Sequence, residues 1–256
     1  MASIHIDALL AQLDHTRANP SYARAVIASD GDGTLWRGDI GEALFTAALK
    51  DGVLPREACA PLRREALRYG LSSQGGSHDV ARRLLHAYEQ GRYPEPRAFA
   101  MMAWVFVGWT ERRLRGYCDD VLDRFLFDDA VRPQMRSLLR WARDRGVPVW
   151  LVSASQQQLV ECAAQRLALP TECVIAMVPN LRGGRLAAGL AKEATYRDGK
   201  VARLRAVESR PLLAAFGDSG FDAPLLDLAH LRVAVFPSAA LRAHVTGVPN
   251  GFVLDG

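Results

Sequence analysis

The 256-residue sequence has little lysine: only Lys50, Lys192 and Lys200 occur, while arginine is abundant. The basic residues are scattered rather than run together, and the formal net charge is only +4. Because there is no basic stripe and no aromatic platform, we expect no nucleic-acid partner. Hydrophobic residues make up 49% of the chain and charged residues 23%, which is typical of a globular protein and excludes a disordered or fibrous one.

Cysteine motifs and long apolar runs are also missing. There is no CxxC pair and no cysteine–histidine spacing of a zinc site, so the four cysteines favour a reduced protein. The longest apolar run, residues 100–109, is too short to span a bilayer. The N-terminus lacks the basic segment of a signal peptide and carries Asp7 early. We therefore expect a cytoplasmic protein without membrane contact.

Five short apolar runs predict an α/β fold. They are residues 23–29, 147–152, 173–178, 212–217 and 231–236, and helical patterns separate the later ones. Strands that alternate with helices form a parallel sheet covered on both faces, and ligands bind outside the carboxyl ends of its strands. The spacing of apolar residues from Ile6 to Leu13 predicts an amphipathic helix packed on this body.

Residues 41–134 are helical in pattern and contain no strand-like run. Because connections in α/β folds are usually short, we predict an inserted helical domain here and a core made of residues 1–40 and 135–256. Helices of one continuous domain are the alternative. Within the core we expect a hairpin over 179–190 that turns at Gly183–Gly184. We also expect a helix over 156–167 that Ser155 caps, with Gln158 completing a capping box.

The segment DGDGTLW, residues 30–36, directly follows the first predicted strand. Asp30 and Asp32 lie two positions apart on a turn whose glycines let the backbone approach a ligand closely. A calcium loop numbered from Asp30 would need Gly at 35 and Glu at 41, but Leu35 and Gly41 stand there. By itself the segment fits either a reactive carboxylate pair or a plain acidic turn.

Four further polar residues are candidates for a functional role. Ser153 follows the second strand, with a helix N-terminus just beyond it, which makes an anion site. Lys200 opens a predicted helix, and Lys192 is its rival as a functional lysine. Asp218 and Asp222 follow the fourth strand and can hold a hard cation directly or through water. The alternatives are helix capping for the serine and aspartates and a solvated surface charge for the lysine.

In this order the motifs resemble those of the haloacid dehalogenase superfamily, over about residues 24–245. The closest likeness is to its phosphoserine-phosphatase-like branch, whose members carry a helical C1-type cap after the first strand. The segment between Thr34 and Ser153 is long enough to contain that cap. The segment between Ser153 and Lys200 is too short to contain a large second cap. The resemblance implies a Rossmann-like parallel-sheet core with an inserted helical cap over 41–134.

The resemblance also implies a Mg²⁺-dependent phosphatase that hydrolyses a small-molecule phosphate monoester through an aspartyl-phosphate. Asp30 matches the nucleophile and Asp32 the general acid/base. Thr34 matches the hydroxyl residue that closes the loop, and Ser153 and Lys200 match the residues that bind the phosphate. Members that attack carbon lack an acid at the position of Asp32, and ion-pumping ATPases carry threonine there. An acid at that position therefore favours a phosphatase or a phosphomutase.

The metal site follows from the same resemblance. Asp218 matches a Mg²⁺ ligand, alongside the Asp30 side chain and the backbone carbonyl of Asp32. Asp222 matches the second acidic residue, which supports the metal shell. A phosphotransferase or phosphomutase with the same intermediate, and a catalytically silent protein that binds a phosphate ligand, are the alternative functions.

Specificity is less defined. In the phosphoserine-phosphatase branch an acidic residue nine positions after the nucleophile contacts the substrate's amino group, and this sequence has Asp39 there with Glu42 nearby. We hypothesise that one of them faces the substrate and favours a cationic or hydroxylated leaving group. The alternative is a charge that complements a helix N-terminus. Trp36, Trp104 and Trp109 are expected in the core of the cap rather than in an aromatic wall for the substrate.

Overall fold

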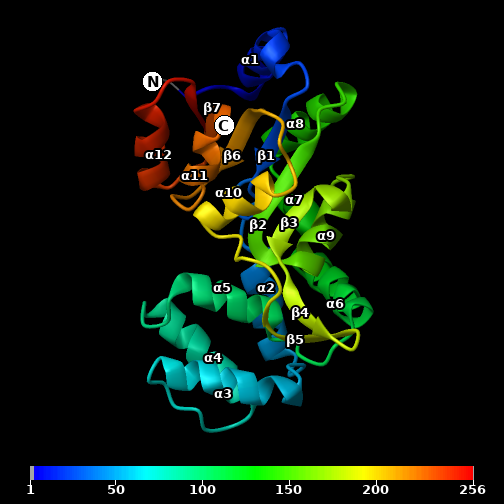
Figure 1. The fold of residues 1–256 in the computed structure, drawn as a ribbon, viewed down its shortest axis with the longest axis vertical. Helices are drawn as coiled ribbons and strands as arrows, with labels where there is room; N and C mark the ends of the chain where they lie inside the picture. The colour runs from blue at the N-terminus through cyan, green and yellow to red at the C-terminus, as the bar shows by residue number, and fades with distance from the viewer. Residues whose placement is uncertain (1–2, 256) are drawn as a thin grey trace.

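The computed structural model describes residues 3–255 and confirms the α/β class. Its centre is a six-stranded parallel sheet with the strand order β3-β2-β1-β6-β7-β8 (Figure 1). The strands are β1 (Val26–Ser29), β2 (Val149–Gln156), β3 (Val174–Met177), β6 (Leu212–Gly217), β7 (Ala229–Val235) and β8 (Gly251–Leu254). The first five coincide with the predicted runs to within a few residues, and β8 was not predicted.

Helices cover both faces of this sheet, which is why its strands are continuous apolar runs. Side chains alternate between the faces: Ile27 of β1 joins one hydrophobic cluster, and Val26 and Ala28 join the other. The first face is covered by α1 (Ile6–Arg17), α8 (Pro133–Asp144) and α9 (Gln157–Arg166). The second is covered by α10 (Asp198–Arg205), α11 (Ala223–Asp227) and α12 (Ala239–Thr246). The predicted N-terminal amphipathic helix is α1.

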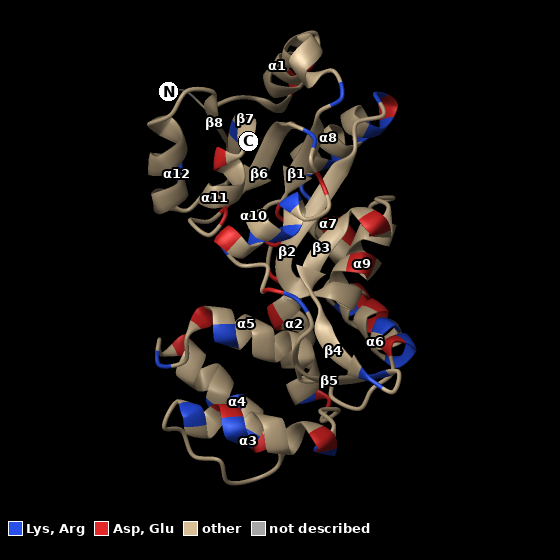
Figure 2. Cartoon of the chain, in the orientation of Figure 1, with Lys and Arg blue, Asp and Glu red and all other residues tan. Residues whose placement is uncertain are grey.

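A separate group of helices lies beyond the carboxyl ends of the strands, in the lower half of Figure 1. It contains α2 (Ile40–Lys50), α3 (Cys59–Arg68), α4 (Ser77–Glu89), α5 (Glu95–Trp104) and α6 (Glu111–Arg124). The short α7 (Phe127–Ala130) follows α6 and lies above this group in Figure 1, near α8. As predicted, residues 41–134 contain helices and no strand. Basic and acidic side chains are interspersed along α3, α4 and α6, as expected for solvated helix faces (Figure 2).

The hairpin of β4 (Pro179–Arg182) and β5 (Arg185–Leu190) turns at Gly183–Gly184, as predicted. It reaches from the sheet to the helical group (Figure 1). The Leu186 carbonyl accepts a 2.8 Å hydrogen bond from the Gly108 amide, and the Leu186 amide donates a 2.9 Å bond to the Trp109 carbonyl. The hairpin therefore ties the loop after α5 to the core.

The predicted capping box of Ser155 and Gln158 is wrong. Strand β2 runs on to Gln156, which pairs with Met177 of β3, so Ser155 is still in the strand. Helix α9 begins at Gln157, and the side chain of Gln156 caps it by accepting a 2.8 Å bond from the Leu159 amide. Within residues 3–255, none of the helices combines the length and apolarity needed to cross a bilayer.

Candidate active site

Asp30 stands on a tight turn directly after β1. The Gly31 carbonyl accepts hydrogen bonds from the amides of Thr34 and Leu35, at 3.1 and 2.8 Å, which folds the turn back on itself. Gly33 has a φ of +76°, and a Cβ there would lie 2.3 Å from Asp218 Oδ2. The turn therefore needs glycine at position 33 for its conformation and for the space that Asp218 fills.

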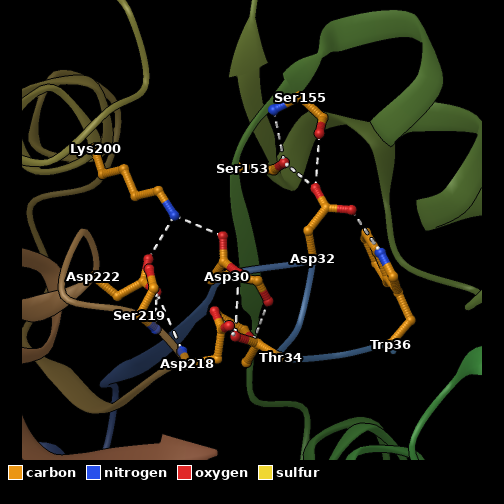
Figure 3. Close-up of polar contacts among 11 residues, drawn as sticks. Asp30, Asp32, Thr34, Trp36, Ser153, Ser155, Lys200, Asp218, Ser219 and Asp222 are labelled. Atoms are coloured by element: carbon orange, nitrogen blue, oxygen red, sulfur yellow. Dashed lines mark hydrogen bonds and ion pairs between the residues drawn. The ribbon is translucent and has the colours of Figure 1, made fainter. Parts of the chain in front are cut away.

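Lys200, in the first turn of α10, reaches the carboxylate of Asp30 (Figure 3). Its Nζ donates hydrogen bonds of 2.6 Å to Asp30 Oδ1 and of 2.6 Å to Asp222 Oδ1. The other oxygen of Asp30 accepts a 3.1 Å bond from the Thr34 hydroxyl. All three charged side chains are buried, with 7% or less of each exposed. The rival Lys192 is exposed.

Asp218 and Asp222 come from the loop between β6 and α11. Asp222 Oδ2 accepts hydrogen bonds from the amides of Asp218 and Ser219 and from the Ser219 hydroxyl. Its other oxygen, Oδ1, accepts a hydrogen bond from Lys200, so both oxygens of Asp222 are engaged by groups of the protein itself. Asp218 Oδ1 has one contact, a 3.4 Å bond from the Thr34 hydroxyl, and so keeps lone pairs for a ligand.

The electrostatics of these groups show an excess of negative charge. Burial raises the pKa of Asp30 well above its usual range; Lys200 opposes the rise, and Asp222 and Asp218 add to it. Burial and then repulsion from Asp222 raise the pKa of Asp218 to about 6. Burial would lower the pKa of Lys200, but attraction to Asp222 and Asp30 prevails and raises it. A cation between the carboxylates would relieve their repulsion.

Three carboxylates converge closely enough to hold a metal ion. Asp30, Asp218 and Asp222 each offer an oxygen atom, and these atoms all lie within 4.8 Å of one another. Hard oxygen donors of this kind are the ligands that Mg²⁺ takes. The donor set therefore fits the predicted magnesium site, in which Asp218 has the fewest hydrogen bonds and Asp222 Oδ2 is engaged by three donors.

The carboxylate of Asp32 accepts hydrogen bonds from residues near the start of α2 and at the end of β2 (Figure 3). Oδ1 accepts a 2.9 Å hydrogen bond from the Trp36 indole and a 2.7 Å bond from the amide of Ile40, the first residue of α2. Oδ2 accepts a 2.7 Å bond from the Ser155 hydroxyl and a 3.4 Å bond from the Ser153 hydroxyl. The acidic turn, the end of β2 and the start of the helical group therefore meet at this side chain.

Ser153 and Ser155 both lie beside Asp32 but differ in their exposure to the cavity. Ser153 is fully buried, and its hydroxyl accepts a 3.0 Å bond from the Ser155 amide. Ser155 lines the cavity described next, and Ser153 is not among the lining residues. The SAS motif contains Ser155, but its pattern indicates a helix cap and does not predict that this residue faces the cavity.

A cavity of about 240 Å³ opens between the turn after β1 and the helical group. Asp30, Asp32, Lys200 and Asp218 form its floor. Asp39 and Glu42, one of which was predicted to face the substrate, both line it as well. Asp39 is also the N-cap of α2, since its Oδ1 accepts a 2.8 Å bond from the Glu42 amide, so the alternative of a helix-terminal charge holds too.

The rest of the lining was not predicted. Four aromatic side chains and one carboxylate come from α4, α5 and the loops before α10 and after β6: Tyr88, Glu95, Phe99, Tyr196 and Phe221. The three tryptophans are instead buried, and none lines the cavity: Trp36, Trp104 and Trp109. No local pattern marks the lining residues, because they lie far apart in the sequence.

The sequence profile of one family, described as haloacid dehalogenase-like hydrolase, matches residues 27–227. A search of curated proteins found no match.

Solved structures share the fold at low sequence identity. A protein of unknown function from Bordetella pertussis Tohama I is 21% identical with a TM-score of 0.68, over 91% of this chain and 98% of that one. A functionally unknown protein from Anaerococcus prevotii DSM 20548 is 13% identical with a TM-score of 0.72, over 98% and 92%. A phosphoserine phosphohydrolase-like protein from Francisella tularensis subsp. tularensis SCHU S4 is 14% identical with a TM-score of 0.54, over 90% and 94%.

Proposed function

Because this chain belongs to the haloacid dehalogenase-like hydrolases, we propose that it is a Mg²⁺-dependent phosphatase that hydrolyses a small-molecule phosphate monoester through an aspartyl-phosphate on Asp30. One observation carries the proposal: Lys200 joins Asp30 to Asp222 by two 2.6 Å hydrogen bonds, within a cluster of carboxylates that fits a metal ion. The likeness to a phosphoserine phosphohydrolase-like protein supports the same reaction class.

In the first step, a carboxylate oxygen of Asp30 attacks phosphorus while the bond from phosphorus to the leaving oxygen breaks. Asp32, two residues on and facing the same cavity, gives its proton to that leaving oxygen. Attack by an anion on an anion is repulsive, and Lys200 offsets part of that repulsion from its place beside Asp30. When bound, Mg²⁺ supplies further positive charge and holds phosphoryl oxygens in place.

In the second step, Asp32 takes a proton from water, and the resulting hydroxide oxygen bonds to phosphorus. The bond between phosphorus and Asp30 breaks, which restores the carboxylate and releases inorganic phosphate. The hydroxyl of Ser155, 2.7 Å from Asp32 Oδ2, holds the acid/base side chain in position for both transfers. The buried Ser153 hydroxyl lies 3.4 Å from the same oxygen of Asp32, and in this proposal it positions Asp32 instead of contacting the phosphate directly.

We propose that residues 41–134 act as the cap of this enzyme and that residues 1–40 and 135–256 are its core. Helices α4 and α5 supply Tyr88 and Phe99 to the cavity, so the helical group covers the reacting centre. A cover of this kind keeps bulk water out during the first transfer and limits the substrate to small molecules. The four cysteines are free thiols, which supports a cytoplasmic location.

The test is release of inorganic phosphate from a panel of phosphate monoesters, with and without Mg²⁺, using Asp30→Asn as the matched control. We expect Mg²⁺-dependent release by the wild-type protein and none by the variant. Phosphate that passes to a second substrate would identify a phosphotransferase. If substrates bind in the presence of Mg²⁺ without turnover, the protein is a phosphate-ligand-binding protein and the proposal is wrong.

A further inference from the structure

Besides Asp30, Asp32, Lys200 and Asp218, the cavity lining combines aromatic rings with acidic side chains. We call this part of the lining the distal wall; it consists of Asp39, Glu42, Tyr88, Glu95, Phe99, Tyr196 and Phe221. Because the substrate's phosphate must lie beside Asp30 and Lys200, the distal wall contacts the part of the substrate that the phosphate esterifies. Its chemistry therefore selects the alcohol.

The rings of the distal wall form a continuous series. The ring centroids of Tyr88 and Phe99 are 5.9 Å apart, those of Phe99 and Tyr196 6.1 Å, and those of Tyr196 and Phe221 5.0 Å. The exposed guanidinium of Arg197 lies 5.3 Å from the Phe221 ring. A protein cation thus already lies over the Phe221 end of the series, and Tyr88 and Phe99 remain as the rings available to a ligand.

The carboxylates of the distal wall have neutral partners. The Glu95 carboxylate accepts a 2.9 Å hydrogen bond from the Tyr196 hydroxyl, and Glu42 accepts a 3.4 Å bond from the Tyr88 hydroxyl. Lys200 is the single basic side chain among the described residues that line the cavity, and Asp30 and Asp222 already engage it. Burial and then repulsion from Asp32 raise the pKa of Asp39 to about 8.

The aromatic rings and carboxylates of the distal wall select a ligand in two ways. Aromatic faces and nearby carboxylates attract an organic cation, and alkyl groups on its nitrogen suit the rings. A substrate carboxylate would meet acidic side chains, and the described residues that line the cavity include no guanidinium and no ammonium group other than the engaged Lys200. The volume of about 240 Å³ also restricts the ligand to a small molecule, because pockets for drug-sized ligands span about 300–1,000 Å³.

Resting on the proposed function, we propose that the substrate is a phosphorylated amino alcohol, with phosphate at one end, an alkylated ammonium at the other and no carboxylate. The ammonium lies against Tyr88 and Phe99 and is balanced by Glu42 and Glu95. Phosphoserine, which adds a carboxylate beside its ammonium, is rejected. Hydrolysis then yields the free amino alcohol and inorganic phosphate.

The experiment compares choline phosphate with 3,3-dimethylbutyl phosphate, which has the same shape but carbon in place of the charged nitrogen. We expect kcat/KM to be about 10-fold or more higher for choline phosphate. Phosphoserine should be a poorer substrate than ethanolamine phosphate, from which it differs by the carboxylate. Equal values for the charged and neutral isosteres, or a preference for phosphoserine, would overturn the inference while leaving the phosphatase proposal intact.

Two variants assign the selectivity to the distal wall. Phe99→Leu keeps an apolar side chain but removes the ring, and Glu95→Gln keeps the shape but removes the charge. Both should lower the ratio of kcat/KM for choline phosphate to that for its neutral isostere. A ratio unchanged in both variants would contradict the assignment.

A binding measurement separates this inference from the proposed function. In the Asp30→Asn protein with Mg²⁺, calorimetry should detect tighter binding of choline phosphate than of the neutral isostere, whether or not the wild-type protein turns either over. No difference in binding would overturn the inference. No turnover of any phosphate monoester together with selective binding would overturn the phosphatase proposal alone.

Discussion

The indole nitrogen of Trp36 donates a 2.9 Å hydrogen bond to Oδ1 of Asp32, four residues before it. Trp36 is fully buried, and its ring lies edge-on to Phe127 with centroids 5.1 Å apart. A Cβ on Gly31 would lie 2.6 Å from the same indole, so the ring fills the inside of the catalytic turn. Trp36 is therefore a positioning residue for the proposed acid/base.

Replacing Trp36 with Phe should slow turnover by about 10- to 100-fold, because a small displacement of a catalytic group has an effect of this size. The variant keeps the aromatic packing and loses the donor to Asp32. Trp104→Phe is the matched control, since Trp104 is buried in the helical group and lies outside the cavity lining. The measurement is kcat with each protein's fold checked by circular dichroism. A normal kcat for Trp36→Phe would show that the hydrogen bond does not position Asp32.

Gly33→Ala should weaken the response to Mg²⁺. The added Cβ would lie 2.3 Å from Asp218 Oδ2 and push away a carboxylate that fits the metal site. Gly91→Ala is the control, because Gly91 also has a positive φ, +68°, but a Cβ there meets nothing within 4 Å.

Alanine is strained at both positions because both glycines have a positive φ, but only Gly33→Ala disturbs Asp218. The concentration of Mg²⁺ that gives half-maximal activity should rise at least about 10-fold in Gly33→Ala and stay near the wild-type value in Gly91→Ala. If the Mg²⁺ concentration for half-maximal activity is the same in the two variants, Mg²⁺ binding does not depend on the space that Gly33 leaves for Asp218.

Glu208 makes a stabilising contribution that depends on pH. Its carboxylate accepts bonds from the Arg210 guanidinium and amide and a 2.8 Å bond from the Trp150 indole, and these contacts, led by Arg210, lower its pKa to about 2. A carboxyl with a lowered folded-state pKa stabilises the fold above its unfolded pKa, and this stability is lost as the pH falls.

Glu208→Gln should therefore lower the free energy of unfolding at pH 7 by about 1–2 kcal/mol. The difference from wild type should narrow as the pH falls from about 5 towards 2, where the native carboxylate is protonated as well. Glu193→Gln, at an exposed residue, is the control. Urea unfolding at several pH values is the measurement, and a difference that does not change with pH would refute the role of the ionised carboxylate.

The sequence predicted the features that local pattern determines. The apolar strand runs and the acidic turns after them place Asp30 and Asp218 at neighbouring strand ends, because β1 pairs with β6 in the sheet. The hairpin followed from Gly183–Gly184, and the helices over 41–134 from their breaks and periodicity. The order of the motifs along the chain predicted the family that the profile match over residues 27–227 shows.

Other features depend on contacts that no local pattern encodes. The segment around Ser155 has the sequence of a capped helix start, but pairing of Gln156 with Met177 extends the strand through it. Strand β8 is only four residues long and follows Asn250, which has a φ of +57°. The distal wall is formed by side chains from separate elements, and only their folded arrangement brings them to one cavity.

The central claim is that Asp30 becomes covalently bonded to phosphorus. The most direct test uses Asp32→Asn with Mg²⁺ and p-nitrophenyl phosphate, whose leaving group needs no proton, so the first step proceeds while the second is slowed. Quenching with hydroxylamine and mapping the modified residue by mass spectrometry should find a hydroxamate at Asp30 that forms only after substrate is added. Release of p-nitrophenol with Asp30 unmodified, or a label on another residue, would contradict the account.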